Sequence, residues 1–448
     1  MSNQKNLKKS IGLFAALSTV IGIVIGSGVF FKANAVFAAT GAPGLGIIAW
    51  GLAGLITIAA GLTSAELAAA IPETGGMVIY LKRIYGNKIG FLTGWMLSIL
   101  YYPGLMAALG FIFASNFASL VGLDASAVPI IAIGVIVLLA FANSLGSKAG
   151  GAIQTVSTLC KLVPLFLIMI LGFVKGDGSA STSLYPITNP DINIATGLGA
   201  ALLGTLFAYE GWLSAGNLAG EMKNPKKDLP KAIVIGITSV TLIYVAINMA
   251  YLWVLPADVL AGSESPASDV ANVIFGATGA RFITAGIAIS IFGTLNALIL
   301  TGPRTLYAVA VENNIPFVSK INKAGAPGNA IWVMSVLGAL YSLTQNFGLL
   351  TDVPIFIVWV FYILTFVGVI ILRKREPNLE RPYKVPLYPI VPLIAIIGGG
   401  YVVVNTLMTQ TQNALLGLGI ALIGLPIYFV INKSNCSKNE TDTLNKAV

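Results

Sequence analysis

Residues 21–30 read IGIVIGSGVF and lie in the middle of an apolar segment that is long enough to cross a membrane. The Gly-Ser-Gly core of this stretch, residues 26–28, is a poor helix former, because glycine costs backbone entropy. Two interpretations are open: the small residues let helices pack closely, or the helix unwinds here. In an unwound helix, the amides after the break attract an anion and the carbonyls before it attract a cation. A zwitterion fits both ends at once.

The composition places the rest of the chain in a membrane as well. Of its 448 residues, 56% are hydrophobic and only 10% are charged, whereas a soluble domain carries about 25% charge. The sequence has no histidine, which excludes catalysis, haem ligation and proton relays that depend on one. Its two cysteines, Cys160 and Cys436, are too few for a zinc cluster or a disulfide framework. We expect no metal and no cofactor.

Windows of about 20 apolar residues predict twelve membrane-spanning helices with short connections. We therefore expect an all-α integral membrane fold with one membrane domain, residues 11–432, between tails at 1–10 and 433–448. The predicted spans are 11–38, 44–70, 90–121, 127–145, 151–174, 194–218, 229–255, 281–310, 329–346, 353–372, 386–408 and 413–432.

The distribution of basic residues predicts the orientation of these spans. With the N-terminus in the cytoplasm, 22 of the 26 basic residues fall in inside segments, as the positive-inside rule requires. Lys32, Lys175 and Arg281 are expected in outside segments, and Lys161 within a span. The net charge of +9 thus reflects membrane topology and does not indicate a nucleic-acid partner. Both termini are expected on the cytoplasmic side of the cell membrane.

Three charged residues are expected within the membrane, where an unpaired charge costs several kcal/mol. Glu210 adjoins Gly211 between aromatic residues, which suggests a second helix break, although helix ends could satisfy the carboxylate without any substrate. Lys161 is too deep in its span to snorkel to the surface, so it is either a fixed cation between helices or a titrating switch. Glu66 lies near the inner end of its span and is expected to pair with a basic residue or a helix N-terminus.

The two breaks fall in the first and sixth spans, which are five helices apart and therefore run in opposite directions. Broken helices at corresponding positions of two halves are typical of transporters with an inverted repeat and a midplane site. We see no sequence identity between the halves, so this prediction rests on topology.

Five stretches in order resemble the amino acid–polyamine–organocation superfamily. Within it, the chain resembles the L-type amino acid transporters, and most of all their bacterial members that exchange serine and threonine. The likeness spans residues 10 to about 430. The stretches are residues 26–30 (GSGVF), 72–76 (PETGG) with Tyr85-Gly86, 207–212 (FAYEGW), 220–227 (GEMKNPKK) with Pro230, and 292–296 (FGTLN) with Pro303-Arg304.

The resemblance implies a five-plus-five inverted repeat with broken helices one and six, two extra C-terminal helices, and alternating access. The substrate carboxylate is then expected on amides of the first break and the ammonium on carbonyls of both breaks. It further implies Phe207 and Tyr244 as gates, and Lys161 as a stand-in for a sodium ion, with Gly22, Ile25 and Ser290 as partners. The implied substrate-binding positions are Val24, Ile25, Gly26, Ser27, Gly28, Val29, Phe207, Ala208 and Glu210.

The chain departs from its eukaryotic relatives at two places. Glu210 replaces a glycine found in many of them, which narrows the pocket and favours small polar or even cationic substrates. The loop at about residues 122–126 lacks the cysteine that links them to an ancillary glycoprotein, so we expect no disulfide-linked partner.

The resulting hypothesis is sodium-independent exchange of small neutral L-amino acids, the alanine, serine, threonine and cysteine class. A proton-coupled symporter is the main alternative, with Lys161, Glu210 or Glu66 as the group that titrates. An ion channel is less consistent with the sequence, because no repeated pore segment or ring of charges is visible. An enzyme is least consistent, because no nucleophile–base or metal constellation occurs.

Overall fold

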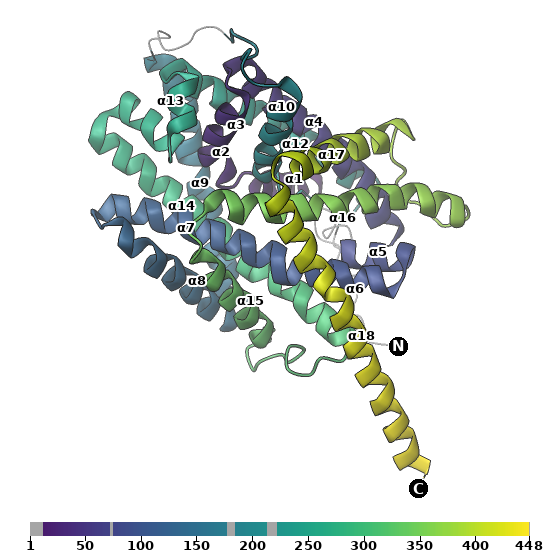
Figure 1. The fold of residues 1–448 in the computed structure, drawn as a ribbon. Helices are drawn as coiled ribbons and strands as arrows, with labels where there is room; N and C mark the ends of the chain where they lie inside the picture. The colour runs from purple at the N-terminus through teal and green to yellow at the C-terminus, as the bar shows by residue number, and fades with distance from the viewer. Residues whose placement is uncertain (1–11, 72–74, 177–183, 213–221, 448) are drawn as a thin grey trace. The chain divides into compact units, whose positions relative to one another are not determined.

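The computed structural model describes residues 12–71, 75–176, 184–212 and 222–447. None of these residues forms a β-strand, and most of them lie in helices (Figure 1). The predicted all-α fold is therefore confirmed. The chain divides into two compact units, residues 1–76, 157–294 and 359–411 in the first and residues 77–156, 295–358 and 412–448 in the second.

The first unit contains both predicted helix breaks. Its helices are α1 (Leu13–Val24), α2 (Gly28–Phe31), α3 (Ala33–Thr40), α4 (Pro43–Ala70), α10 (Ile194–Ala208), α12 (Pro225–Val254), α13 (Ala257–Gly262) and α17 (Ile390–Thr409). Helix α4 packs against α3, α10, α12 and α17, and α10 also packs against α2 and α3 (Figure 1). These contacts bring the two broken segments to the same part of the unit.

Local sequence explains where two of these helices begin. Pro43 opens α4, where its fixed φ suits a first turn and its missing amide proton is not needed. The side chain of Asn193 caps α10 by accepting hydrogen bonds from the amides of Ala195 and Thr196, at 3.0 and 3.2 Å.

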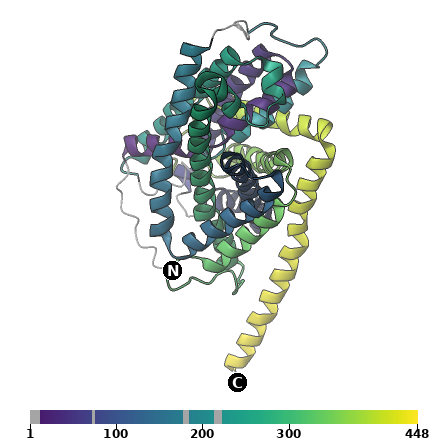
Figure 2. The same cartoon turned by 90° about the vertical axis from the view of Figure 1, so that its left-hand side faces the viewer.

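The second unit is built from α5 (Met77–Tyr85), α6 (Asn87–Met96), the π-helical turn η1 (Leu97–Tyr101), α7 (Tyr102–Val121), the 3-10 turn η2 (Ala125–Ala127), α8 (Val128–Ser144), α15 (Gly328–Ser342) and most of α18 (Thr411–Ala447). Helices α7, α8 and α15 pack against one another. Figure 2 shows α18 as one long helix that runs to the C-terminus. It is joined to α6 by a hydrogen bond of 3.0 Å from the Trp95 indole to the Ile420 carbonyl.

Three long helices are shared between the units: α9 (Ser147–Lys175), α14 (Pro266–Glu312) and α16 (Phe347–Arg375). Helix α14 begins earlier than the predicted span at 281–310. It is kinked at Gly276, which has a φ of 67° that favours glycine. The predicted start therefore falls just beyond this kink.

Eight helices of the described residues are long and apolar enough to cross a membrane. They correspond to the predicted spans two, three, four, seven, eight, ten, eleven and twelve. The other four predicted spans coincide with α1–α3, α9, α10 and α15. The C-terminal part of the sixth span, residues 213–218, lies outside the described residues.

One residue that was assigned to an outside segment is buried within the protein. Lys32 was expected in an outside segment, but it lies between α2 and α3 within the first span and is only 2% exposed. The predicted first span, residues 11–38, already includes this position. Among the residues that the structure describes, Lys32 is thus a third buried charged residue, besides Glu66 and Lys161.

Candidate functional site

The first helix break lies where the Gly-Ser-Gly sequence predicts it. Helix α1 ends at Val24, Ile25 is extended with a φ of −68° and a ψ of 96°, and α2 begins at Gly28. All of residues 24–29 are buried. The last carbonyls of α1 and the first amides of α2 lack partners within their own helices. A buried donor and a buried acceptor are therefore presented together at one point of the chain.

The second break follows α10, which ends at Ala208. Tyr209 to Trp212 form turns, and Gly211 has a φ of 108°, in the region that favours glycine. The amides of Tyr209 and Glu210 turn back to the carbonyls of Thr205 and Phe207, at 3.1 and 3.2 Å. Helix α10 thus ends where Glu210 and Gly211 predict a break.

The two breaks touch through their backbones. A Cβ atom on Gly28 would lie 2.5 Å from the Ala208 Cα atom and 2.7 Å from its Cβ atom. Such distances are far inside van der Waals contact, so only glycine fits at residue 28. The first residue of α2 therefore packs directly against the last residue of α10.

Tyr244 of α12 bridges the two breaks from a second side. Its hydroxyl lies 2.9 Å from the Val24 carbonyl oxygen and 3.0 Å from the Ala208 carbonyl oxygen, and its side chain is fully buried. A hydroxyl has one proton to donate, so the two carbonyls share it. The last carbonyls of α1 and α10 therefore converge on one point, about one hydrogen-bond length from both.

Aromatic side chains fix the Tyr244 ring in place. Trp50 of α4 meets it edge-on, with ring centroids 5.5 Å apart, and the Tyr209 ring lies 5.0 Å away. The Tyr209 hydroxyl donates to the Trp50 carbonyl at 2.9 Å. The sequence does not predict Trp50 and Tyr209 as site residues. Both lie in largely apolar spans, and such a span does not indicate which side chains face the site. Tyr244 was expected near an outer gate, and a gating role stays a prediction.

Lys161 of α9 contacts the first broken helix. Its ammonium donates to the Gly22 carbonyl, one turn before the break, and its side chain is 4% exposed. Ser290 of α14, expected as a further partner, is fully buried, but its hydroxyl makes no hydrogen bond with any described residue. The structure gives no hydrogen bond from Lys161 to the Ile25 carbonyl either.

Helix α14 flanks the same break. A Cβ atom on Gly26 would lie 3.6 Å from the Thr294 side chain. One residue earlier, Gly293 packs so closely on Ser157 of α9 that a Cβ atom would lie 2.2 Å from the Ser157 Cβ atom. Helices α9 and α14 therefore support α1 just beside its unwound residues.

Glu210 at the second break is held by α16. Its carboxylate accepts a hydrogen bond of 2.7 Å from the Tyr362 hydroxyl, and its side chain is partly exposed. The Tyr362 ring packs edge-on against Trp212 at a centroid distance of 5.0 Å. A carboxylate thus lies two residues after the end of α10 and accepts a hydrogen bond from the Tyr362 hydroxyl.

Phe207 meets a cation. The Lys32 ammonium lies over its ring, 5.2 Å from the centroid, and the Phe207 side chain is 8% exposed. Lys32 and Phe207 belong to the two broken segments, α2–α3 and α10. The pair is therefore a third connection between the breaks, besides the Gly28 contact and the Tyr244 hydroxyl.

Glu66 belongs to a separate ionic cluster at the C-terminal ends of α4 and α16. Arg373 donates to both of its carboxylate oxygens, at 2.7 and 2.6 Å, and the amide of Val385 donates to one of them at 2.7 Å. Arg381 lies 3.6 Å away. Burial and the nearby Glu66 carboxylate raise the pKa of the Tyr383 phenol. The expected pairing of Glu66 with a basic residue is confirmed.

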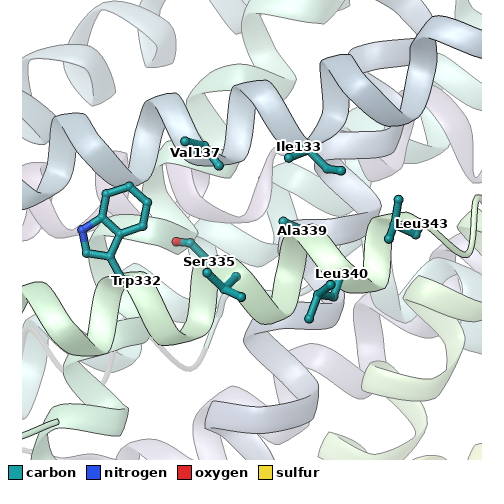
Figure 3. Close-up of a pocket in the computed structure, with 8 residues that line it drawn as sticks. Ile133, Val137, Trp332, Ser335, Ala339, Leu340 and Leu343 are labelled. Atoms are coloured by element: carbon teal, nitrogen blue, oxygen red, sulfur yellow. The ribbon is translucent and has the colours of Figure 1, made fainter. Parts of the chain in front are cut away.

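A surface pocket in the second unit is unrelated to these residues. It is lined by apolar side chains of α8 and α15, with Trp332 at one end and Leu343 at the other (Figure 3). Ser335 supplies the single hydroxyl among its lining residues. Within the described residues, no group of three or more acidic, cysteine or histidine side chains is placed to hold a metal ion.

Comparisons with known proteins identify the family of the chain. Residues 11–431 match the family model described as amino acid permease. The chain is 40% identical to the serine/threonine exchanger SteT of Bacillus subtilis, and the match covers 97% of this chain and all of the relative. It is 32% identical to the human large neutral amino acids transporter small subunit 2, over 95% of this chain and 80% of the relative. It is 30% identical to the mouse Asc-type amino acid transporter 1, over 99% and 86%. The chain belongs to the amino acid permease family and is a multi-pass membrane protein.

Proposed function

We propose that the protein is a sodium-independent exchanger of small neutral L-amino acids of the alanine, serine, threonine and cysteine class. The observation that carries the proposal is the convergence of the Val24 and Ala208 carbonyls beside the first amides of α2. Carbonyls bind an ammonium and helix N-terminal amides bind a carboxylate, so the pair of breaks suits the two charged groups of one amino acid. The serine/threonine exchanger among the relatives supports the substrate class.

In this proposal, the substrate carboxylate binds the amides of residues 27–29. Its ammonium binds carbonyls of both breaks, from Val24 or Ile25 and from Phe207, Ala208 and Glu210. The Tyr244 hydroxyl contacts two of these carbonyls. It therefore marks the position of the ammonium and holds the carbonyls in register between substrates.

In this proposal, Lys161 acts as a fixed cation. Its ammonium on the Gly22 carbonyl anchors α1 to α9 without a metal ion, which is the physical basis for sodium independence. Binding of substrate at both breaks favours closure over the site. An empty carrier lacks these contacts and returns slowly, so net transport is slow compared with exchange.

The test is an exchange assay in proteoliposomes that contain the purified protein and labelled L-alanine. External unlabelled L-serine is expected to accelerate efflux of the label several-fold, equally in sodium and in choline buffer. Efflux at the same rate with and without external substrate excludes exchange. Efflux that requires sodium excludes the anchoring role of Lys161.

Glu210 is the observation that favours the second candidate, a proton-coupled symporter, because a partly exposed carboxylate adjoins the break. A pH gradient that drives accumulation of alanine into vesicles without internal substrate, and fails to do so in Glu210→Gln, would favour symport over exchange.

We also propose cytoplasmic N- and C-termini, because this orientation keeps 22 of 26 basic residues inside. No disulfide-linked subunit is needed in this proposal, because residues 122–126 contain no cysteine. The tails at 1–10 and 433–448 and the single membrane domain between them stay predictions. So does the five-plus-five inverted repeat.

A further inference from the structure

One face of α12 carries three fully buried side chains with polar groups, those of Tyr244, Asn248 and Tyr251. Residues three, four and seven apart lie on the same face of a helix. The Tyr244 hydroxyl reaches the Val24 carbonyl at 2.9 Å, just before the first break. The Tyr251 hydroxyl reaches the Val29 carbonyl at 3.4 Å, just after it. This face of α12 therefore runs along the whole of the first break.

Asn248 lies between the two tyrosines, and the mechanism above does not use it. Its amide nitrogen donates to the backbone carbonyl of Tyr244 at 2.8 Å. A carbonyl can only accept, so this bond decides which end of the side-chain amide is the nitrogen and which is the oxygen. The Oδ1 atom is buried and makes no hydrogen bond with any residue that the structure describes. A buried acceptor in this state is unfavourable unless a bound molecule supplies a donor.

The groups that the two breaks already bind decide which donor this is. The substrate carboxylate, placed on the amides of residues 27–29, is itself an acceptor, so a carbonyl-type oxygen repels it. The substrate ammonium already has the Val24 and Ala208 carbonyls, which converge at the Tyr244 hydroxyl. A small neutral amino acid offers one further donor, the hydroxyl or thiol on the side chain of serine, threonine or cysteine. Alanine has none.

We propose that the Oδ1 atom of Asn248 accepts a hydrogen bond from the side-chain hydroxyl of the substrate, so that the site prefers serine and threonine over apolar amino acids of the same size. This inference rests on the proposed function. Asn248 lies one helical turn, about 5.4 Å, beyond Tyr244, whose hydroxyl marks the position of the ammonium. The hydroxyl of serine is one carbon away from the carbon that bears both charged groups, so it stays close to the break.

The acceptor favours hydroxyl substrates because it penalises their apolar counterparts. A hydroxyl satisfies the Oδ1 atom, whereas a methyl group in the same place excludes water and leaves the acceptor unpaired. Sites built to bond a substrate hydroxyl reject analogues that lack it for this reason. One neutral hydrogen bond, together with this penalty, corresponds to a difference of about tenfold in affinity. L-Serine and L-2-aminobutyrate give the sharpest comparison, because they differ only by a hydroxyl in place of a methyl group.

The test measures competition against labelled L-alanine exchange in proteoliposomes. The competitors are L-serine and L-2-aminobutyrate, with L-threonine and L-valine as a second pair of matched shape. Asn248→Leu keeps the approximate volume of the side chain and removes the acceptor. Asn116→Leu is the matched control, because Asn116 of α7 is also buried and donates the same kind of bond one turn back, to the Ile112 carbonyl at 2.8 Å.

The wild type and Asn116→Leu are expected to bind serine about tenfold more tightly than 2-aminobutyrate, and threonine more tightly than valine by a similar factor. Asn248→Leu is expected to bind the members of each pair within about twofold of each other. The ratio is the deciding measurement, because loss of the bond to the Tyr244 backbone changes both inhibition constants together. An unchanged ratio in Asn248→Leu overturns the proposal. So does a wild type that binds serine and 2-aminobutyrate equally.

Two further variants keep the test decisive if Asn248→Leu does not fold. Asn248→Ala and Asn248→Val also remove the acceptor, with smaller side chains. Failure of all three variants to fold, with Asn116→Leu folded, assigns Asn248 to stability and overturns the proposal. Failure of the proposed function is a different result, namely wild-type protein that shows no alanine exchange at all.

Discussion

The Tyr244 hydroxyl lies 2.9 Å from the Val24 carbonyl oxygen, at the last residue of α1 before the break. The same hydroxyl reaches the Ala208 carbonyl at 3.0 Å. One side chain of α12 therefore ties together the ends of two broken helices that are more than 180 residues apart in sequence. Because both carbonyls are proposed ligands of the substrate ammonium, this bridge sets their separation.

Replacement of Tyr244 with phenylalanine is expected to slow exchange at least about fivefold, because a net hydrogen bond of about 1 kcal/mol is lost and two buried carbonyls are released. Rates of labelled alanine exchange in proteoliposomes measure the effect. Tyr341→Phe is the control, since it removes a hydroxyl that bonds the Ile99 carbonyl at 3.0 Å within the second unit. Equal rates for the Tyr244→Phe variant and the wild type would show that the bridge has no part in transport.

Gly28→Ala is expected to abolish exchange, because the added methyl group would overlap Ala208 at 2.5 Å and push α2 away from α10. Overpacking of this kind costs about 1–3 kcal/mol of stability, so the variant should still fold with a lowered Tm. Gly400→Ala in α17 is the matched control, because a Cβ atom there meets no atom within 4 Å. Normal exchange by the Gly28→Ala variant would contradict the close contact between the breaks.

Lys161→Ala is expected to reduce translocation strongly while the protein remains folded, because α1 loses its anchor on α9 at Gly22. The exchange rate in proteoliposomes measures translocation, and the elution profile of the detergent-solubilised protein shows whether the variant is folded. Lys175→Ala, which changes an exposed lysine at the C-terminal end of the same helix, should behave like wild type. Turnover at the wild-type rate in Lys161→Ala removes this lysine from the mechanism.

Glu66→Ala is expected to lower the stability of the protein by about 3 kcal/mol or more, because it leaves Arg373 without its buried carboxylate partner. Thermal unfolding in detergent measures the loss as a fall in Tm. Glu312→Ala is the comparison, since Glu312 pairs with Lys82 on the surface and an exposed pair contributes about 1 kcal/mol or less. Similar Tm values for the two variants would contradict a structural role for the Glu66 cluster.

The sequence predicts those features that depend on local composition. Apolar runs locate the spans, and glycine beside polar residues locates both breaks, since an unwound membrane helix needs residues that tolerate it. It also predicts that Glu66 pairs, because a charge near the end of a span has basic neighbours within reach. The predicted start of the eighth span, residue 281, lies after the observed start of α14 at Pro266. The apolar pattern does not reveal that α14 continues through the Gly276 kink.

Contacts between distant segments account for what the sequence does not predict. The positions of Tyr244 and Tyr362 depend on how α12 and α16 face the breaks, and a span that is apolar all round carries no periodic signal of its facing. Lys32 differs from these residues, because its position within the predicted span 11–38 already indicates a charge inside the protein. A lysine inside a predicted span deserved the same interpretation as Lys161, and its burial against Phe207 shows why.

The central claim is that one substrate binds with its carboxylate at the first break and its ammonium at the carbonyls of both. Competition against labelled L-alanine exchange by L-alanine, L-alaninamide and propionate tests it most directly, because the last two each lack one of the charged groups. We predict that alanine competes and that neither analogue does so at a hundredfold higher concentration. Competition by alaninamide or propionate within a few-fold of alanine would contradict the claim.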